Sequence, residues 1–118
     1  MLKEFSFGKK NILRSSSEFS EVYLSGKKII LKNFIYIYLK KKSGDPKLGV
    51  VVSKKCFKNA TDRNHTKRIC KEVFRKMLPI LGPVEVIVIA KKNYSSTMKQ
   101  KRFEQVNNDW EKFIKCVL

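Results

Sequence analysis

Apolar and polar positions alternate along residues 28–42, and this period of two predicts β-structure. The segment is rich in Ile, Phe and Tyr, and Lys32-Asn33 divides it into two strands. Gly44-Asp45-Pro46 then has the residue types of a turn. Two further runs, at residues 48–53 and 84–90, predict a third and a fourth strand.

Three segments have helical spacing instead. A short helix is predicted at residues 18–24, behind serines that can cap a helix. A longer basic helix is predicted from about residue 62 to residue 78, with its end near Pro79 and Gly82-Pro83. The final helix is predicted from about residue 98 to residue 116, and it carries Phe103, Val106, Trp110 and Phe113.

The predicted order α-β-β-β-α-β-α indicates an α+β sandwich, in which helices pack on one four-stranded, mainly antiparallel sheet. We expect a single domain over residues 1–118, because 118 residues with 42% hydrophobic residues can bury one core and leave no room for a second. If the third and fourth strands are parallel neighbours, the basic helix is the crossover between them. The general rule would make that crossover right-handed.

The basic helix segregates its charges when it is wound at 100° per residue. Its cationic stripe lies within about 60° of arc and contains Asn64, Arg68, Lys71 and Arg75. A separate arc is expected to pack, and it contains Thr66, Ile69, Cys70, Val73, Phe74 and Met77. The remaining sector holds His65, Glu72 and Lys76, so the stripe is kept apart from the only acid nearby. This face suits a polyanion, and a merely solvated charged face is the alternative.

The composition also points to an anionic partner. The chain has 27 Lys and Arg residues against 10 Asp and Glu residues, which gives a net charge of +17 at pH 7. A domain with this much like charge repels itself unless a partner supplies the opposite sign. Nucleic acid is the commonest such partner, ahead of an anionic membrane surface. We therefore expect a nucleic-acid-binding domain with no membrane partner.

The three cysteines, Cys56, Cys70 and Cys116, are odd in number and form no Cys-x-x-Cys pair. This pattern argues against a disulfide framework and a zinc site, and it predicts buried thiols in a reducing compartment. The N-terminal segment has no apolar stretch of signal-peptide length, and the longest apolar run, at residues 84–90, is too short to span a bilayer. We expect a cytoplasmic protein.

The acidic residues form no pair with the spacing of a general acid and a general base, and no cluster that would hold metal ions. His65 is the only histidine, and we interpret it as a helix-surface residue, since Asp62 is the only acid near it. We therefore predict no catalytic residues and no metal site in the protein. A nuclease that works alone is not expected.

Two segments together resemble the signature of the bacterial ribonuclease P protein subunit. The first is Gly49-Val50-Val51-Val52-Ser53-Lys54-Lys55, and the second is Arg63-Asn64-x-x-Lys67-Arg68-x-x-Lys71-Glu72-x-Phe74-Arg75. Other short motifs occur along nearly the whole chain in the same order as in that family. They are Glu18-Phe19, Val22-Tyr23, Gly26, Leu48-Gly49 and Val86-Ile87-Val88-Ile89-Ala90.

The resemblance implies a protein that binds a large catalytic RNA subunit, in a 1:1 complex, and helps it remove the 5′ leader of precursor tRNA. The complex would be an endoribonuclease whose chemistry is carried by the RNA, with Mg²⁺ held mainly by the RNA subunit and no small-molecule substrate. The resemblance also implies a left-handed crossover, against the general rule for parallel strands.

By position, the resemblance assigns binding of the RNA subunit to Arg63, Asn64, Lys67, Arg68 and Lys71. Arg75 joins this set through the cationic stripe, and Lys54 and Lys55 would add phosphate contacts beside the start of the helix. His65 and Lys71 stand where the family usually has arginine. The first change removes a permanent charge, and the second removes a bidentate phosphate contact.

Contact with the single-stranded leader is assigned by the resemblance to Phe19 and Tyr23, on whose rings bases can stack. Ile37 is assigned to the same leader-binding surface, because it falls where many family members carry tyrosine, and strand alternation puts Tyr36 and Tyr38 on the opposite face. Without the resemblance, Phe19 and Tyr23 would be interpreted as core residues, because apolar residues at helical spacing usually pack.

Two alternatives come from other functional classes. The first is a ribosomal-protein-like module that binds RNA without a role in cleavage. The second is a helix-turn-helix DNA-binding protein, which is less favoured because the basic helix lacks a preceding short helix and tight turn. The RNA that co-purifies with the protein would distinguish these classes.

Overall fold

The predicted strands form one open sheet in the computed structural model of the chain, which describes residues 8–96 and 98–117. The strand order is β1-β2-β4-β3. The strands are β1 (Lys27–Ile30), β2 (Phe34–Lys40), β3 (Lys47–Val51) and β4 (Val84–Ala90). β1 and β4 each pair with β2 in antiparallel orientation, whereas β3 pairs with β4 in parallel. The sheet is therefore mainly antiparallel, as predicted.

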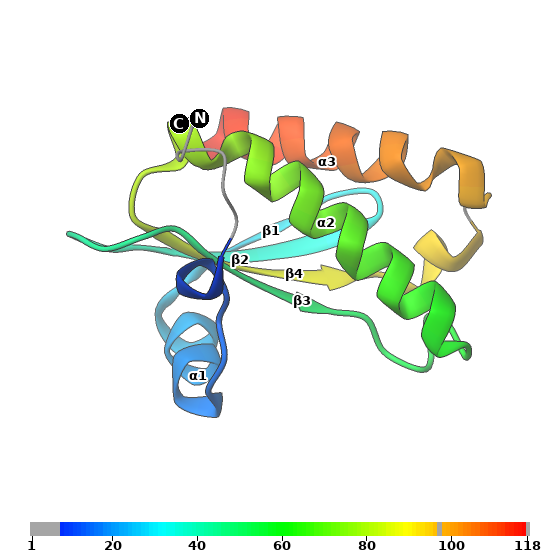
Figure 1. Cartoon of the computed structure of the whole chain (residues 1–118), viewed down its shortest axis with the longest axis horizontal. Coiled ribbons are helices and arrows are strands. Elements are labelled where there is room, and N and C mark those ends of the chain that lie inside the picture. The colour runs from blue at the N-terminus through cyan, green and yellow to red at the C-terminus, as the bar shows by residue number, and fades with distance from the viewer. Residues whose placement is uncertain (1–7, 97, 118) are drawn as a thin grey trace.

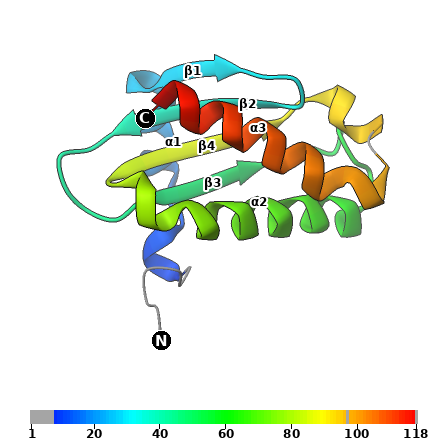
Figure 2. The same ribbon diagram turned by 90° about the horizontal axis from the view of Figure 1, so that it is seen from above.

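Helices cover both faces of this sheet. Among the described residues, the α-helices are α1 (Ser16–Ser25), α2 (Ala60–Leu81) and α3 (Arg102–Val117), and short 3₁₀ segments are η2 (Lys9–Asn11), η3 (Lys92–Ser96) and η4 (Lys99–Lys101). α2 and α3 lie over one face, and α1 lies against the other (Figures 1 and 2). The predicted α+β class and element order are confirmed. Residues 1–7, 97 and 118 of the predicted domain lie outside the described residues.

α2 is the crossover between the parallel strands β3 and β4. In Figure 2 both strands run to the right, β3 lies below β4, and α2 lies on the viewer's side of the sheet, so the connection is left-handed. The general right-handed rule is wrong for this chain, and the family-based expectation holds. With the same strand order, a right-handed crossover would place α2 on the opposite face. The N-terminal segment already covers that face, where Leu13 and α1 pack on the sheet.

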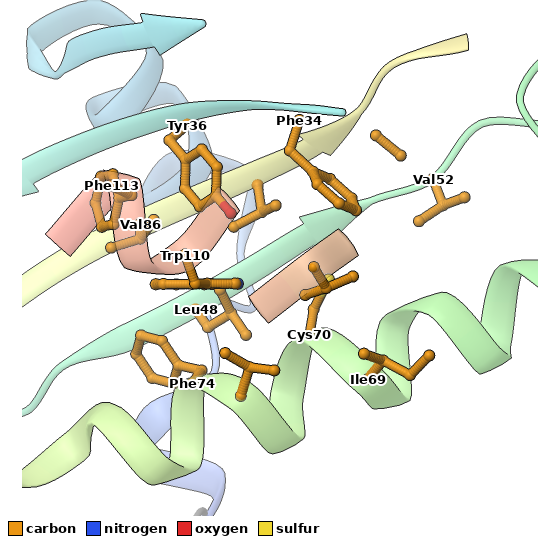
Figure 3. Packing of buried hydrophobic residues seen from close by; sticks show 14 of the residues in the cluster. Phe34, Tyr36, Leu48, Val52, Ile69, Cys70, Phe74, Val86, Trp110 and Phe113 are labelled. Carbon is orange, nitrogen blue, oxygen red and sulfur yellow. The ribbon is translucent and has the colours of Figure 1, made fainter. Parts of the chain in front are cut away.

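The side chains of β2 alternate between the two faces of the sheet. Phe34, Tyr36 and Tyr38 pack toward α2 and α3. The ring of Tyr36 lies with its centroid 4.6 Å from that of Phe113 and 5.2 Å from that of Trp110 (Figure 3). The other face of the strand packs beneath α1 and carries Ile35, Ile37 and Leu39. This alternation gives the domain two separate apolar clusters.

The basic helix extends slightly beyond the predicted residues 62–78. It begins at Ala60, continues through Pro79 to Leu81, and ends at Gly82, which belongs to the predicted end region. A proline in the last turn removes only one backbone N–H and therefore only one helical hydrogen bond. Burial of Leu81 favours the extra turn, and Gly82 then ends the helix with a φ of 65°, in the left-handed region that suits glycine.

Two other boundaries also differ from the prediction. β3 ends at Val51 and not at Ser53, because the carbonyl of Ser53 accepts bonds from the backbone N–H groups of Cys56 and Phe57 in a turn. The final helix becomes regular only at Arg102, and the 3₁₀ turn η4 precedes it. Short 3₁₀ turns are frequent at the ends of α-helices.

α1 is fixed at its start by a capping box. Ser15 Oγ accepts a hydrogen bond from the backbone N–H of Glu18, and Glu18 Oε1 accepts bonds from the N–H groups of Arg14 and Ser15 at 2.9 and 3.1 Å. Lys47 on β3 also donates to Glu18 Oε2 at 2.9 Å. These bonds, first those from Arg14 and Ser15, lower the pKa of Glu18 to about 2. One carboxylate thus holds the helix start and ties it to the sheet.

Replacing Glu18 with glutamine should therefore destabilise the protein in a pH-dependent way. Because the pKa of Glu18 is lower in the folded than in the unfolded chain, its contribution is present above the unfolded value and is lost as the pH falls toward about 2. Urea unfolding should show a gap in unfolding free energy between the wild type and Glu18→Gln that narrows over this range. The exposed Glu104→Gln is the control. A gap that stays constant down to about pH 2 would contradict this role.

Candidate nucleic-acid interface

The two faces of α2 are arranged as the sequence predicts over most of its length. Asn64, Arg68 and Lys71 are exposed, and Lys67 is half-buried at the edge of the stripe. The packing arc is buried at Thr66, Ile69, Cys70, Val73 and Phe74. Packing of these residues on the sheet fixes the rotation of the helix about its axis. The cationic side chains are thereby directed away from the core.

The loop before α2 places two more lysines beside this stripe. Lys54 and Lys55 are exposed in the turn that follows β3. Asn59 occupies the N-cap position of α2, but its side chain caps no backbone group among the described residues. First-turn N–H groups carry the positive end of the helix dipole. The turn and the helix start therefore form one region of positive potential.

Arg63 has a structural contact that the sequence did not reveal. Its Nη1 donates hydrogen bonds to the carbonyls of Phe57 and Lys58, both at 2.8 Å. The guanidinium group thus holds the loop that carries the two lysines against the helix start. Arg63 contributes positive charge there and also orders the backbone of the interface.

The predicted separation of the stripe from Glu72 is wrong at its C-terminal end. Arg75 Nε donates to Glu72 Oε2 at 3.2 Å, and the two side chains form an ion pair three residues apart. The bond from Arg75 lowers the pKa of Glu72. Residues three apart on a helix are neighbours, and long side chains bridge the angle between them. The uncompensated charge of α2 is therefore concentrated toward its first three turns.

His65 is not a plain surface residue, because it contacts the start of α3. Arg102 Nη1 lies 3.1 Å from His65 Nδ1, which can only accept this bond, so the ring proton is assigned to Nε2. Burial, followed by the charge of Arg102, lowers the pKa of His65. The lowered pKa favours the neutral form of the imidazole. The positive charge in this sector comes instead from the neighbouring arginine.

Arg102 is the residue that sequence analysis missed. It is only 5% exposed, its Nη2 lies 3.1 Å from Asp62 Oδ1, and its guanidinium lies 4.6 Å from the centroid of the Phe57 ring. These contacts join α3 to the start of α2 and to the preceding loop. No local pattern signals them, because the partners are about forty residues away in sequence. The interface is therefore held together by long-range packing.

A second candidate surface lies on the opposite face of the sheet, along α1. Phe19 is half-buried and packs over Gly49, where an added Cβ would come within 2.6 Å of the ring. Tyr23 is 46% exposed, and its ring centroid lies 6.4 Å from that of Phe19. The two rings thus share one side of α1. Tyr23 offers the larger accessible surface, while Phe19 also contributes to packing.

Ile37 does not present an accessible platform beside these rings. Its side chain is 7% exposed and packs with Val22 in the cluster beneath α1. Tyr36 and Tyr38 lie on the other face against Phe113, so neither takes its place. The assignment of Ile37 to leader contact is therefore corrected to a supporting role. β2 provides an aliphatic base for α1 and no third ring on this side.

The three cysteines differ in their exposure. Cys56 and Cys70 are buried, whereas Cys116 is exposed on the outer side of α3, so the prediction of three buried thiols is wrong for Cys116. The described residues contain no group of three or more His, Cys, Asp or Glu side chains that could hold a metal ion. No helix in the described part of the chain is long and apolar enough to cross a membrane.

Comparisons with known proteins agree with the sequence resemblance. The family model described as Ribonuclease P matches residues 7–117. The ribonuclease P protein component of Legionella pneumophila (strain Lens) is 33% identical over 112 residues, which cover 95% of this chain and 96% of the relative. That of Saccharophagus degradans is 35% identical over 94% of this chain and 83% of the relative.

Solved structures show the same architecture. The RNase P protein of Staphylococcus aureus superposes with a TM-score of 0.80 at 26% identity, over 92% of this chain and 96% of that one. The RNase P protein from Thermotoga maritima gives a TM-score of 0.77 at 28% identity, over 87% of this chain and 94% of that one. The chain therefore belongs to the ribonuclease P protein family, whose members are subunits of an endoribonuclease that processes tRNA.

Proposed function

We propose that this chain binds the ribonuclease P RNA subunit through the first half of α2 and the loop before it, and binds the 5′ leader of precursor tRNA along α1. The proposal rests on the cationic face of α2, where Asn64, Arg68 and Lys71 are exposed and Lys67 is half-buried at the edge, beside the exposed Lys54 and Lys55. Membership of the family favours this function over a ribosomal-protein-like module or a DNA-binding protein.

The two surfaces lie on opposite faces of the sheet, and this separation supports simultaneous binding of two RNA molecules. α2 lies on one face and α1 on the other (Figure 1). The α2 surface offers charge for phosphates, whereas the α1 surface offers the partly exposed rings of Phe19 and Tyr23 for bases. One protein can therefore contact one RNA subunit and one leader, which corresponds to a 1:1 holoenzyme.

In this proposal the protein assists a reaction that is carried out by RNA. Mg²⁺ held mainly on the RNA subunit would activate the water and stabilise the leaving oxygen. The protein's lysines and arginines neutralise phosphates, so that fewer divalent ions are needed to bring RNA subunit and substrate together. Because the proposed substrate is precursor tRNA, the protein would act in the cytoplasm.

Reconstitution tests the proposal directly. Rigorously RNA-free protein should not cleave precursor tRNA, whereas the protein together with its RNA subunit should cleave it at a lower Mg²⁺ concentration than the RNA subunit alone. Both effects are measured by detecting the released 5′ leader on gels over a titration of Mg²⁺. Robust cleavage by the protein alone would contradict the division of labour. An unchanged Mg²⁺ requirement would contradict the role of the cationic surface.

Arg68 gives a specific test of the α2 surface. Arg68→Ala should change the free energy of unfolding by no more than about 0.5 kcal/mol, because the side chain is exposed. It should weaken binding of the RNA subunit and lower the slope of log K against log salt by about one unit. Filter binding over a salt series measures the slope, and thermal melting checks the fold.

Lys76→Ala is the matched control for Arg68, since it removes one positive charge from the same helix. Lys76 is exposed, and its ammonium lies 5.3 Å from the centroid of the Phe103 ring, on the side that faces α3. We expect a much smaller effect on RNA binding. Equal losses from the two substitutions would mean that only net charge matters, and the proposed docking face would be wrong.

Tyr23 gives the cleaner test of the α1 surface, because Phe19 is partly used in packing. Tyr23→Ala should weaken holoenzyme binding of precursor tRNA with a leader of several nucleotides by about 1–3 kcal/mol, as expected for loss of one stacked base. Mature tRNA should bind nearly as before. Tyr23→Phe keeps the ring and should retain affinity. An equal loss for both ligands, or a large drop in melting temperature, would show that the ring is structural.

A further inference from the structure

A second group of lysines lies at the end of the sheet where β3 and β4 finish. It extends from the loop before α2 to the two 3₁₀ segments that precede α3. We call it the sheet-end surface, and it consists of the exposed Lys54, Lys55, Lys58, Lys92, Lys99 and Lys101. The proposed α2 interface includes only the first two of these residues. The other four have no role in the function described so far.

Three contacts bring these distant segments together. Cys56 Sγ lies 3.6 Å from the carbonyl oxygen of Lys91, and the rings of Phe57 and Tyr94 have centroids 5.8 Å apart. Arg102 lies over the other side of this cluster, against Phe57. Residues 52–59, η3 and η4 are therefore parts of one packed unit. Their lysines are held on a common scaffold.

Few acids lie near this surface, and Glu104 in the first turn of α3 is the exposed acid next to it in sequence. Residues 52–61 and 91–103 contain no Asp or Glu. Asp62 is paired with Arg102, and Asp109 is buried, where it accepts bonds from the backbone N–H groups of Asn33 and Phe34. Six exposed ammonium groups on one scaffold repel one another. A polyanion that contacts several of them would relieve this repulsion.

The surface is suited to a nucleic-acid backbone more than to unpaired bases. Phe57 and Tyr94, which form its scaffold, are buried, and the accessible ring of Phe103 next to it faces Lys76 of α2, whose ammonium lies 5.3 Å from the ring centroid. Lysine acts as a point charge toward phosphate and carries no base specificity by itself. Contact with a folded RNA through its phosphates requires only this charge.

Its position favours the RNA subunit over the leader. η3, η4 and the start of α2 lie together at one end of the molecule, whereas α1 lies toward the other end and on the opposite face of the sheet (Figures 1 and 2). The surface is continuous with the first turn of α2, because Arg102 at the end of η4 pairs with Asp62. An RNA that docks on Asn64 and Arg68 can continue across this end without reaching Tyr23.

We propose that Lys92, Lys99 and Lys101 extend the docking surface for the RNA subunit from α2 onto η3 and η4, where they contact RNA phosphates. This inference rests on the proposed function of the α2 surface. It adds a partner-binding role for a segment between β4 and α3 that lies outside the family's signature residues. It also gives Arg102 a positioning role, since this residue holds the two parts of the surface together.

The test compares two triple variants that remove the same charge. Lys92→Ala/Lys99→Ala/Lys101→Ala changes the sheet-end surface, and Lys42→Ala/Lys112→Ala/Lys115→Ala changes exposed lysines elsewhere. Binding to the transcribed RNA subunit is measured by filter retention over a salt series, with melting temperature as the check on folding. The first variant should lose about tenfold or more in affinity and about two to three units of salt slope, and the control about one unit or less.

Each outcome distinguishes the proposals. If the wild-type protein fails to bind the RNA subunit, the proposed function itself fails. If the wild type binds and both triple variants lose affinity equally, the α2 interface stands and the sheet-end proposal is overturned. The affinity advantage of precursor over mature tRNA should be unchanged in the sheet-end variant. A variant that binds RNA normally but loses binding to phosphatidylserine vesicles would assign the surface to a membrane and would also overturn the proposal.

Discussion

The central strand β2 carries aromatic side chains on one face and aliphatic side chains on the other, and both proposed RNA surfaces depend on this alternation. Phe34, Tyr36 and Tyr38 support α2 and α3, while Ile35 and Ile37 support α1. A shift of the strand by one residue would exchange these faces. The register is fixed from both sides, since β2 pairs with β1 and with β4. The distance and orientation between the two surfaces follow from this one strand.

Three of the acidic residues form contacts that hold elements of the fold together. Glu18 caps α1 and binds β3, Asp62 holds Arg102, and Asp109 satisfies two backbone N–H groups. Each of these carboxylates stabilises a junction between elements. They therefore neutralise little of the exposed charge on α2 or at the end of the sheet. The high net charge is concentrated on surfaces that face outward, where it can release counterions from RNA.

Most of the fold was predictable from local patterns. Alternation and apolar runs located the strands, and the capping serines indicated where α1 begins. The separation of charged and apolar residues on the helical wheel identified the buried side of α2. The errors arose where long-range contacts override local signals. β3 stops at Val51 because Ser53 closes a turn, and the crossover is left-handed against the general rule, with Leu13 and α1 packed on the other face of the sheet.

The candidate site shows the same limit. Residue type and helical position predicted the cationic stripe, but they did not reveal which cations already have partners. Arg63 holds backbone carbonyls, Arg75 pairs with Glu72, and Arg102 is almost fully buried. Burial of Ile37 likewise depends on how closely α1 packs on β2. These properties arise from three-dimensional neighbours and are not encoded in spacing along the chain.

The insertion of β4 between β2 and β3 has a consequence for biogenesis. Chain emerging from the ribosome can form the β1-β2 hairpin early, but β3 has only the single bridge from Ile12 to Leu48 until its neighbouring strand at residues 84–90 arrives. The loop before α2 then gains its final support only when Arg102 reaches Phe57 and Asp62. A nascent chain therefore acquires its complete RNA-binding geometry late in synthesis. Incomplete chains carry many of the same positive charges without the arrangement that would select the correct RNA.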